Sequence, residues 1–247
     1  MIYFLKSINQ ILSGIDAMFF RYPVVLTYHS VSDGETPISV RTEEFRRQMD
    51  FLKSRRIKVL TLRDFLDIES GKIPSAGKSV LITFDDAFRD VYRNALPVLR
   101  SHGFPATIFI NDGLIGKKAE FSTRPIDRER EICSLSDLHA LEAGGVAIAN
   151  HGHSHRQLSE LAEADVLYEY EVTSNFIRNN FKNNGFPNIF VFPKGAKNEK
   201  VKSFLRSKGA RIPDNRIDIY SDTSLFKFTL KLSNSYLWLR RRVFLLK

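Results

Sequence analysis

Two pairs of side chains in this sequence have the types and spacing of a metal-assisted hydrolytic site. His151 and His155 lie four residues apart, and Asp85 and Asp86 are adjacent. Two imidazoles and one carboxylate supply the three protein ligands of an open catalytic zinc site, whose fourth position holds a water of lowered pKa. A second carboxylate beside the ion can take the proton from that water. The adjacent aspartates can therefore divide the roles of ligand and base.

These residues belong to four polar clusters, each of which follows an apolar run of the sequence: Tyr28-His29, Asp85-Asp86, residues 150–155 and Pro193-Lys194-Gly195. Taken singly, each cluster has an ordinary interpretation as a turn, a helix cap or a structural histidine. In parallel α/β folds, however, catalytic residues collect at the carboxyl ends of the strands. Four clusters in such positions predict a single functional site on one rim of the sheet.

The elements that must position these clusters alternate along the chain. Short apolar or β-branched runs are separated by segments of helical periodicity, which predicts parallel strands with crossover helices, in a barrel or a doubly wound sheet. The charged segment 117–131 is predicted to be a solvated loop over the barrel mouth. The expected strands are 24–28, 57–60, 80–84, 106–110, 146–149, 189–192 and 217–220, and the expected helices are 42–55, 62–68, 90–101, 136–143, 159–182 and 198–207.

The composition is that of a globular protein. Of the 247 residues, 43% are hydrophobic and 26% are charged, which excludes an intrinsically disordered chain and a collagen-like fibre. The single cysteine, Cys133, excludes an internal disulfide framework and a cysteine-rich zinc fold. Because no linker divides the chain, we expect one domain over residues 22–220.

The two ends of the sequence are expected to lie outside this domain. Residues 1–21 have apolar side chains at helical spacing and predict an amphipathic helix, while Lys6 and Asp16 interrupt the apolar run that a secretory signal needs. Residues 176–247 carry 16 Lys or Arg and 4 Asp or Glu, and residues 221–247 form a basic amphipathic tail. Both ends can pack on the domain or contact an anionic membrane surface. We therefore expect a cytoplasmic or peripheral membrane protein that binds no nucleic acid.

At the polar clusters the sequence resembles a known family. Residues 81–87 (Leu-Ile-Thr-Phe-Asp-Asp-Ala), 151–155 (His-Gly-His-Ser-His) and 192–195 (Phe-Pro-Lys-Gly) are similar, in this order, to three motifs of the polysaccharide deacetylases. These are the NodB-homology domains of carbohydrate esterase family four. The early Tyr28-His29 is similar to the subset of the family that includes enzymes acting on poly-N-acetylglucosamine. The resemblance covers roughly residues 22–210.

The resemblance implies an irregular (β/α)7 barrel, similar to a TIM barrel, that removes N-acetyl groups from amino sugars of a polysaccharide or glycan. It implies a divalent metal, for which Zn²⁺ is the expected ion at a site of nitrogen and oxygen ligands. It also implies that Asp85 is the base, that His29 protonates the leaving amine and that the backbone N–H of Lys194 binds the acetyl oxygen. The implied metal ligands are Asp86, His151 and His155.

Three residues depart from the family pattern. Ala87 stands where glycine usually follows the aspartates, which is tolerated unless that residue needs a positive φ. Gly152 replaces a Ser or Thr whose hydroxyl would hold the loop, and Lys194 replaces an aromatic residue that shapes the sugar site. These departures leave open a catalytically impaired carbohydrate-binding protein on the same fold. A non-haem iron oxygenase also uses two histidines and one carboxylate, but the α/β alternation and the paired aspartates disfavour it.

Overall fold

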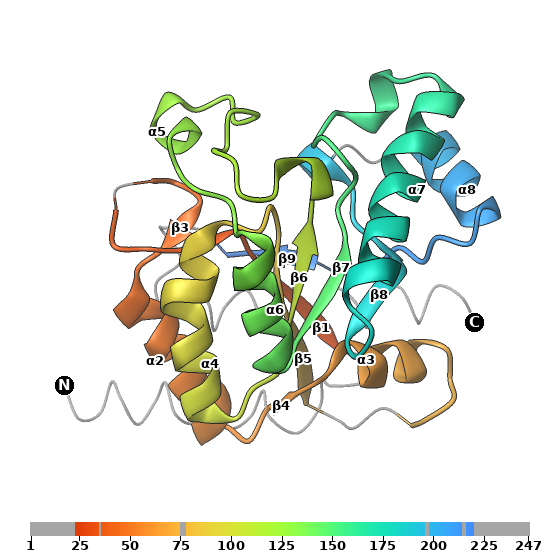
Figure 1. The fold of residues 1–247 in the computed structure, drawn as a ribbon. Coiled ribbons are helices and arrows are strands. Elements are labelled where there is room, and N and C mark those ends of the chain that lie inside the picture. Colours follow the sequence, from red (N-terminus) through yellow and green to blue (C-terminus); the bar gives the residue numbers. More distant parts are fainter. Residues whose placement is uncertain (1–22, 35, 75–77, 196–197, 214–215, 220–247) are drawn as a thin grey trace.

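The structure is a computed structural model that describes residues 23–34, 36–74, 78–195, 198–213 and 216–219 (Figure 1). The predicted helix over 1–21 and the basic tail over 221–247 lie outside the described residues. The main sheet of the described chain consists of β1 (Val24–Tyr28), β4 (Lys58–Val59), β5 (Ser79–Phe84), β6 (Ala106–Ile110), β7 (Val146–Asn150), β8 (Gly185–Phe190) and β9 (Arg216–Asp218). Its α-helices are α2 (Thr42–Ser54), α3 (Leu62–Glu69), α4 (Leu96–His102), α5 (Pro125–Arg128), α6 (Leu135–Ala143), α7 (Glu163–Asn180) and α8 (Glu199–Ser207).

The strands pair in parallel in the order β8-β7-β6-β5-β1-β9, and β4 pairs with the start of β5. Every residue of β1, β5, β6 and β7 is buried. Burial on both faces explains why these strands read as continuous apolar runs instead of alternating ones. Because all strands run the same way, their carboxyl ends, with the polar clusters that follow them, lie at one edge of the sheet.

Helices cover the two faces of the sheet unequally (Figure 1). On the outer face, Val24 and Leu26 of β1 pack in one apolar cluster with α2, α4 and α6. On the inner face, Val25 and Leu81 pack in a second cluster with the apolar side of α3. The helices α7 and α8 form a third cluster against β8. None of the helices in the described ranges combines the length and the apolar composition that a bilayer span requires.

In the part of the chain that the structure describes, the sheet resembles an irregular barrel that is not closed between its two edge strands. Within the described residues no ladder joins the edge strands β8 and β9. Beside β8, however, Arg211 makes two backbone hydrogen bonds, to Asn188 (2.8 Å) and from Phe190 (2.9 Å). Only five residue steps separate Arg211 from Arg216, the first residue of β9, and such a segment spans at most ~18 Å. The two edges are therefore linked by a short stretch of chain, and the α/β fold predicted from the sequence is confirmed.

Several boundaries differ from those predicted. The helix expected over 90–101 begins as a π-helix, Val91–Ala95, and continues as α4. Pro97 has no N–H to donate to the residue four positions before it, so the regular α-helix can begin only here. The last strand before Pro193 is Gly185–Phe190 and not 189–192. Two short strands, β2 (Ser30–Val31) and β3 (Ser39–Val40), pair in parallel and were not predicted, because two residues show no periodicity.

The charged segment 117–131 is only in part the solvated loop that was predicted: most of its charged side chains are exposed, but Asp127 and Arg130 are not. It contains α5, and Asp127 is fully buried. Oδ1 of Asp127 accepts hydrogen bonds from the Thr36 hydroxyl (2.6 Å) and from Arg130 (3.0 Å). The Arg130 guanidinium also pairs with Asp90 (2.5 Å) and lies over the Phe88 ring, 4.4 Å from its centroid. The charges satisfy one another inside the fold, which the composition of the segment does not reveal.

Candidate active site

Asp85 and Asp86 follow β5 where the backbone leaves the strand conformation. The N–H of Asp85 still donates to the Tyr28 carbonyl (2.9 Å) and extends the ladder between β1 and β5. Asp86 has a φ of 68°, in the left-handed region. Successive side chains of a strand point to opposite faces. The change of conformation at Asp86 allows both carboxylates to line the same cavity.

Ala87 and Gly152 also adopt left-handed backbone conformations. Ala87 has a φ of 55°, so the position where the resemblance implies glycine does need a positive φ. An alanine in this conformation costs about 1–2 kcal/mol. Gly152 has a φ of 81°, and a Cβ there would lie 3.4 Å from Oε2 of Glu169. A Ser or Thr at position 152 would therefore be strained in this loop.

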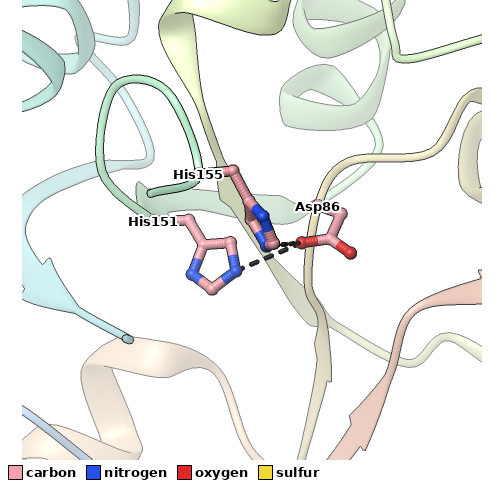
Figure 2. A group of neighbouring side chains, drawn as sticks. All are labelled: Asp86, His151 and His155. Atoms are coloured by element: carbon pink, nitrogen blue, oxygen red, sulfur yellow. Dashed lines mark ion pairs between the residues drawn. The ribbon is translucent and has the colours of Figure 1, made fainter. Parts of the chain in front are cut away.

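Three of the predicted residues converge on one point (Figure 2). Oδ1 of Asp86 lies 3.2 Å from Nε2 of His151 and 3.1 Å from Nε2 of His155. One ligand atom of each residue lies within 4.8 Å of the other two, and all three side chains are buried. The aspartate follows β5 and the histidines follow β7, so residues 65 and 69 positions apart in the sequence meet beyond the end of the intervening β6.

The donor set of this cluster fits a divalent cation. Nδ1 of His151 lies 2.9 Å from the Val191 carbonyl oxygen, which only accepts, so Nδ1 carries the proton. In the neutral ring, the lone pair of Nε2 then faces Asp86, as a metal ligand requires. One carboxylate and two imidazoles are the ligands expected of a catalytic zinc site with an open position. We therefore conclude that Asp86, His151 and His155 can hold a metal such as Zn²⁺.

The electrostatics of the cluster also favour a positive charge at its centre. Burial by itself raises the pKa of Asp86, but the hydrogen bonds of His151 and His155, with the charges of His155 and His29, outweigh it. The pKa of this carboxyl is therefore held well below its ordinary value. Burial lowers the pKa of His151, and the hydrogen bond of Asp86 with the charge of Asp85 outweighs that effect and raises the pKa. A cation bound between these groups replaces the proton that would otherwise be shared between the carboxylate and the imidazoles.

A cavity of about 690 Å³ lies against the cluster and contains the remaining predicted residues. His29, which follows β1, lines it together with Asp85 and Lys194. Lys194 lies in a single 3₁₀ turn, Pro193–Gly195, with a φ of 57° and an exposed side chain. The structure thus brings all six predicted site residues to one cavity, and their individual roles stay predictions.

His153, the third histidine of the motif, does not take part in the cluster. Its Nδ1 lies 3.0 Å from Oδ1 of Asp112, and its ring packs edge-on against the exposed Tyr168. Asp112 belongs to a short 3₁₀ helix, η2 (Asp112–Leu114), which follows β6. In an extended strand the three histidines would share one face. The left-handed backbone at Gly152 and His155 instead directs the first and last histidines to the metal position and the middle one away from it.

Sequence reasoning missed several residues that line the cavity. Phe121 lies with its ring centroid 4.2 Å from that of His155. Arg124 comes from the same segment, which was predicted to be a solvated loop. Asp218 lies on β9 and pairs in register with Thr27 of β1. Thr27 comes directly before Tyr28 and His29 in the sequence. No local signal identifies these residues, because each reaches the cavity only through long-range packing.

A comparison with protein families matches residues 72–213, more than half of the chain, to the family described as polysaccharide deacetylase. The Bacillus subtilis (strain 168) protein YxkH is 30% identical over 186 residues, which make up 75% of this chain and 61% of that protein. The poly-beta-1,6-N-acetyl-D-glucosamine N-deacetylase of Staphylococcus aureus (strain MSSA476) is 28% identical over 177 residues, 70% of this chain and 59% of that enzyme. The chain thus spans about three fifths of the length of these relatives.

Solved structures show the same fold. IcaB from Ammonifex degensii superposes with a TM-score of 0.71 at 22% identity, over 86% of this chain and 97% of that one. The Streptococcus pyogenes deacetylase PplD gives a TM-score of 0.70 at 17% identity, over 87% of this chain and 99% of that one. At these identities the likeness is evidence for the architecture alone.

Proposed function

The chain belongs to the polysaccharide deacetylase family, and from this membership we propose that it is a metal-dependent hydrolase. Its proposed reaction removes N-acetyl groups from amino sugars of a polysaccharide or glycan. The observation that carries the proposal is the buried cluster of Asp86, His151 and His155 beside a second carboxylate, Asp85, in one cavity. Its volume, about 690 Å³, lies in the ordinary range of small-molecule and sugar sites.

In this proposal Asp86, His151 and His155 would hold the ion, which would supply Lewis acidity and make the attacking water more acidic. Asp85 accepts the proton of the attacking water, which forms the new bond to the acetyl carbon. The backbone N–H of Lys194 donates a hydrogen bond to the acetyl oxygen as charge develops there. His29 gives its proton to the amine nitrogen as the C–N bond breaks, so acetate and a free amino sugar leave.

The magnitudes expected of these groups make the assignments testable. A positioned acid or base typically contributes 10²–10⁴-fold to the rate, and one donor to a developing oxyanion about 10²–10³-fold. Asp85 and His29 therefore each have a measurable role. Lys194 acts through its main chain, and the left-handed backbone at this residue sets the direction of its N–H.

The decisive experiment is mass spectrometry of acetylated glucosamine oligomers incubated with metal-loaded protein. Loss of acetyl groups that stops on addition of a chelator and returns with Zn²⁺ is the expected result. Because one relative is named for a β-1,6-linked polymer, β-1,6- and β-1,4-linked oligomers should be compared. Binding of oligomers without any loss of acetyl would instead favour the alternative, a carbohydrate-binding protein that has lost catalysis.

A further inference from the structure

The loop that carries both metal-facing histidines, here named the histidine loop (residues 150–155), is held from behind by α7. Glu169 of α7 is 2% exposed. Its Oε2 accepts a hydrogen bond from the N–H of Ser154 (2.8 Å), and its Oε1 accepts one from the Ser154 hydroxyl. Both carboxylate oxygens of the buried Glu169 thus accept hydrogen bonds from Ser154, the residue directly before His155.

His155 needs such support because of its backbone. It has a φ of 59°, in the left-handed region that a residue with a side chain occupies at a cost of about 1–2 kcal/mol. The loop contains a second left-handed residue, Gly152, whose N–H donates to Oδ1 of Asn150 (2.8 Å). A strained loop relaxes unless its surroundings hold it. The bidentate contact of Glu169 holds Ser154, the residue directly before His155, through its N–H and its hydroxyl.

The same helix is also linked to the histidine loop indirectly, through Asp112. Thr173, one turn after Glu169, donates its hydroxyl to Oδ1 of Asp112 (2.5 Å). That carboxyl oxygen also lies 3.0 Å from Nδ1 of His153. One face of α7 therefore fixes the two loop residues that point away from the metal position. The histidines on either side of them, His151 and His155, are directed toward Asp86.

We propose that Glu169 is a positioning residue whose carboxylate sets the metal affinity of the site through Ser154 and His155. The inference rests on the metal site of the proposed function. A solely structural role would concern the packing of α7 on β7 and would leave the metal affinity of the folded protein unchanged. Outer partners that orient metal ligands typically contribute 10–100-fold to metal affinity. The proposal assigns an effect of this size to a residue that touches neither metal nor substrate.

The test is the Zn²⁺ dissociation constant of the full chain, measured by competition with a chromogenic chelator. Glu169→Ala removes both contacts and is expected to weaken Zn²⁺ binding about 10–100-fold. Glu169→Gln keeps the shape and one acceptor and is expected to lose less. Glu171→Gln is the matched control, since Glu171 is exposed on the same helix two positions further on. Its dissociation constant should equal that of the unsubstituted protein.

A second readout reports on the ligands themselves. The visible absorption of the Co²⁺-loaded protein depends on coordination geometry, and Glu169→Ala should change it while Glu171→Gln should not. Thermal unfolding of the metal-free proteins measures any loss of stability separately. A folded Glu169→Ala variant with unchanged Zn²⁺ affinity and Co²⁺ spectrum would overturn the proposal. If the unsubstituted protein binds no metal, the proposed function fails as well.

Should Glu169→Ala fail to fold, Ser154→Ala tests the same contact from the other side. It removes the hydroxyl and keeps the main-chain N–H, so a weakening of about threefold to tenfold is expected. Where both variants fold, the double variant should bind Zn²⁺ no more weakly than Glu169→Ala alone, because both changes remove the same interaction. Unchanged affinity of Ser154→Ala, or full additivity in the double variant, would contradict the proposal.

Discussion

We expect the substitution of aspartate by asparagine to have different effects at the two adjacent positions, on metal binding at Asp86 and on kcat at Asp85. Asp86 contacts both histidines, with Oδ1 at 3.2 and 3.1 Å from their Nε2 atoms. Asp86→Asn replaces this anionic ligand by a neutral amide, so the site keeps two imidazoles and loses its charge. We expect the Zn²⁺ affinity to fall by more than about 100-fold, the upper end for loss of a mere outer partner. The protein should then be isolated largely without metal.

Asp85→Asn, in contrast, leaves the three ligand residues unchanged and removes the proton acceptor. An amide of the same shape cannot take a proton from water, so kcat should fall by about 10²–10⁴-fold. That loss corresponds to about 3–5 kcal/mol of transition-state stabilisation. The metal content should remain that of the unsubstituted protein. The contrast between metal content and kcat separates the two roles.

The assay combines elemental analysis of dialysed protein with deacetylation of acetylated glucosamine oligomers. Asp165→Asn, an exposed aspartate of α7, controls for the change of one charge and should alter neither quantity. If Asp85→Asn loses its metal while Asp86→Asn retains it, the two roles have been exchanged. If both variants keep metal and activity, the cavity is not the catalytic site.

Three further predictions concern other parts of the molecule. His29→Ala should lower kcat by about 10²–10⁴-fold with unchanged metal content, and near-normal turnover would assign the acid role to another group. Asp127→Ala removes the buried acceptor of the Thr36 hydroxyl and of one Arg130 N–H, while Arg130 keeps its pair with Asp90, so urea denaturation should show a loss of about 2–3 kcal/mol in the free energy of unfolding; a loss below about 0.5 kcal/mol would contradict this. Cys133 is fully buried, and burial raises the pKa of its thiol, so iodoacetamide should modify the native protein at least about 100-fold more slowly than the urea-unfolded chain. Equal rates would show that the thiol is accessible.

The strand–helix alternation and the edge of the sheet at which the site lies could both be predicted from the sequence. Continuous apolar runs such as Ser79–Phe84 are visible locally because a strand buried on both faces needs apolar side chains at every position. Parallel pairing then places the residues after each strand at one rim. Hence the sequence alone predicted that Asp85, Asp86 and the histidine loop lie near one another. The motif resemblance added the chemistry expected of them.

The separate roles of the residues at that rim could be assigned only from the folded structure. Whether Asp85 or Asp86 faces the histidines depends on the left-handed backbone after β5, which side-chain periodicity does not encode. The segment 117–131 reads as solvated because its charges are counted singly, yet Asp127 and Arg130 are paired and desolvated in the fold. Glu169 looks like any acidic residue of a long helix until α7 packs behind the histidine loop. Each of these outcomes depends on contacts between residues distant in sequence, whose energies no local pattern contains.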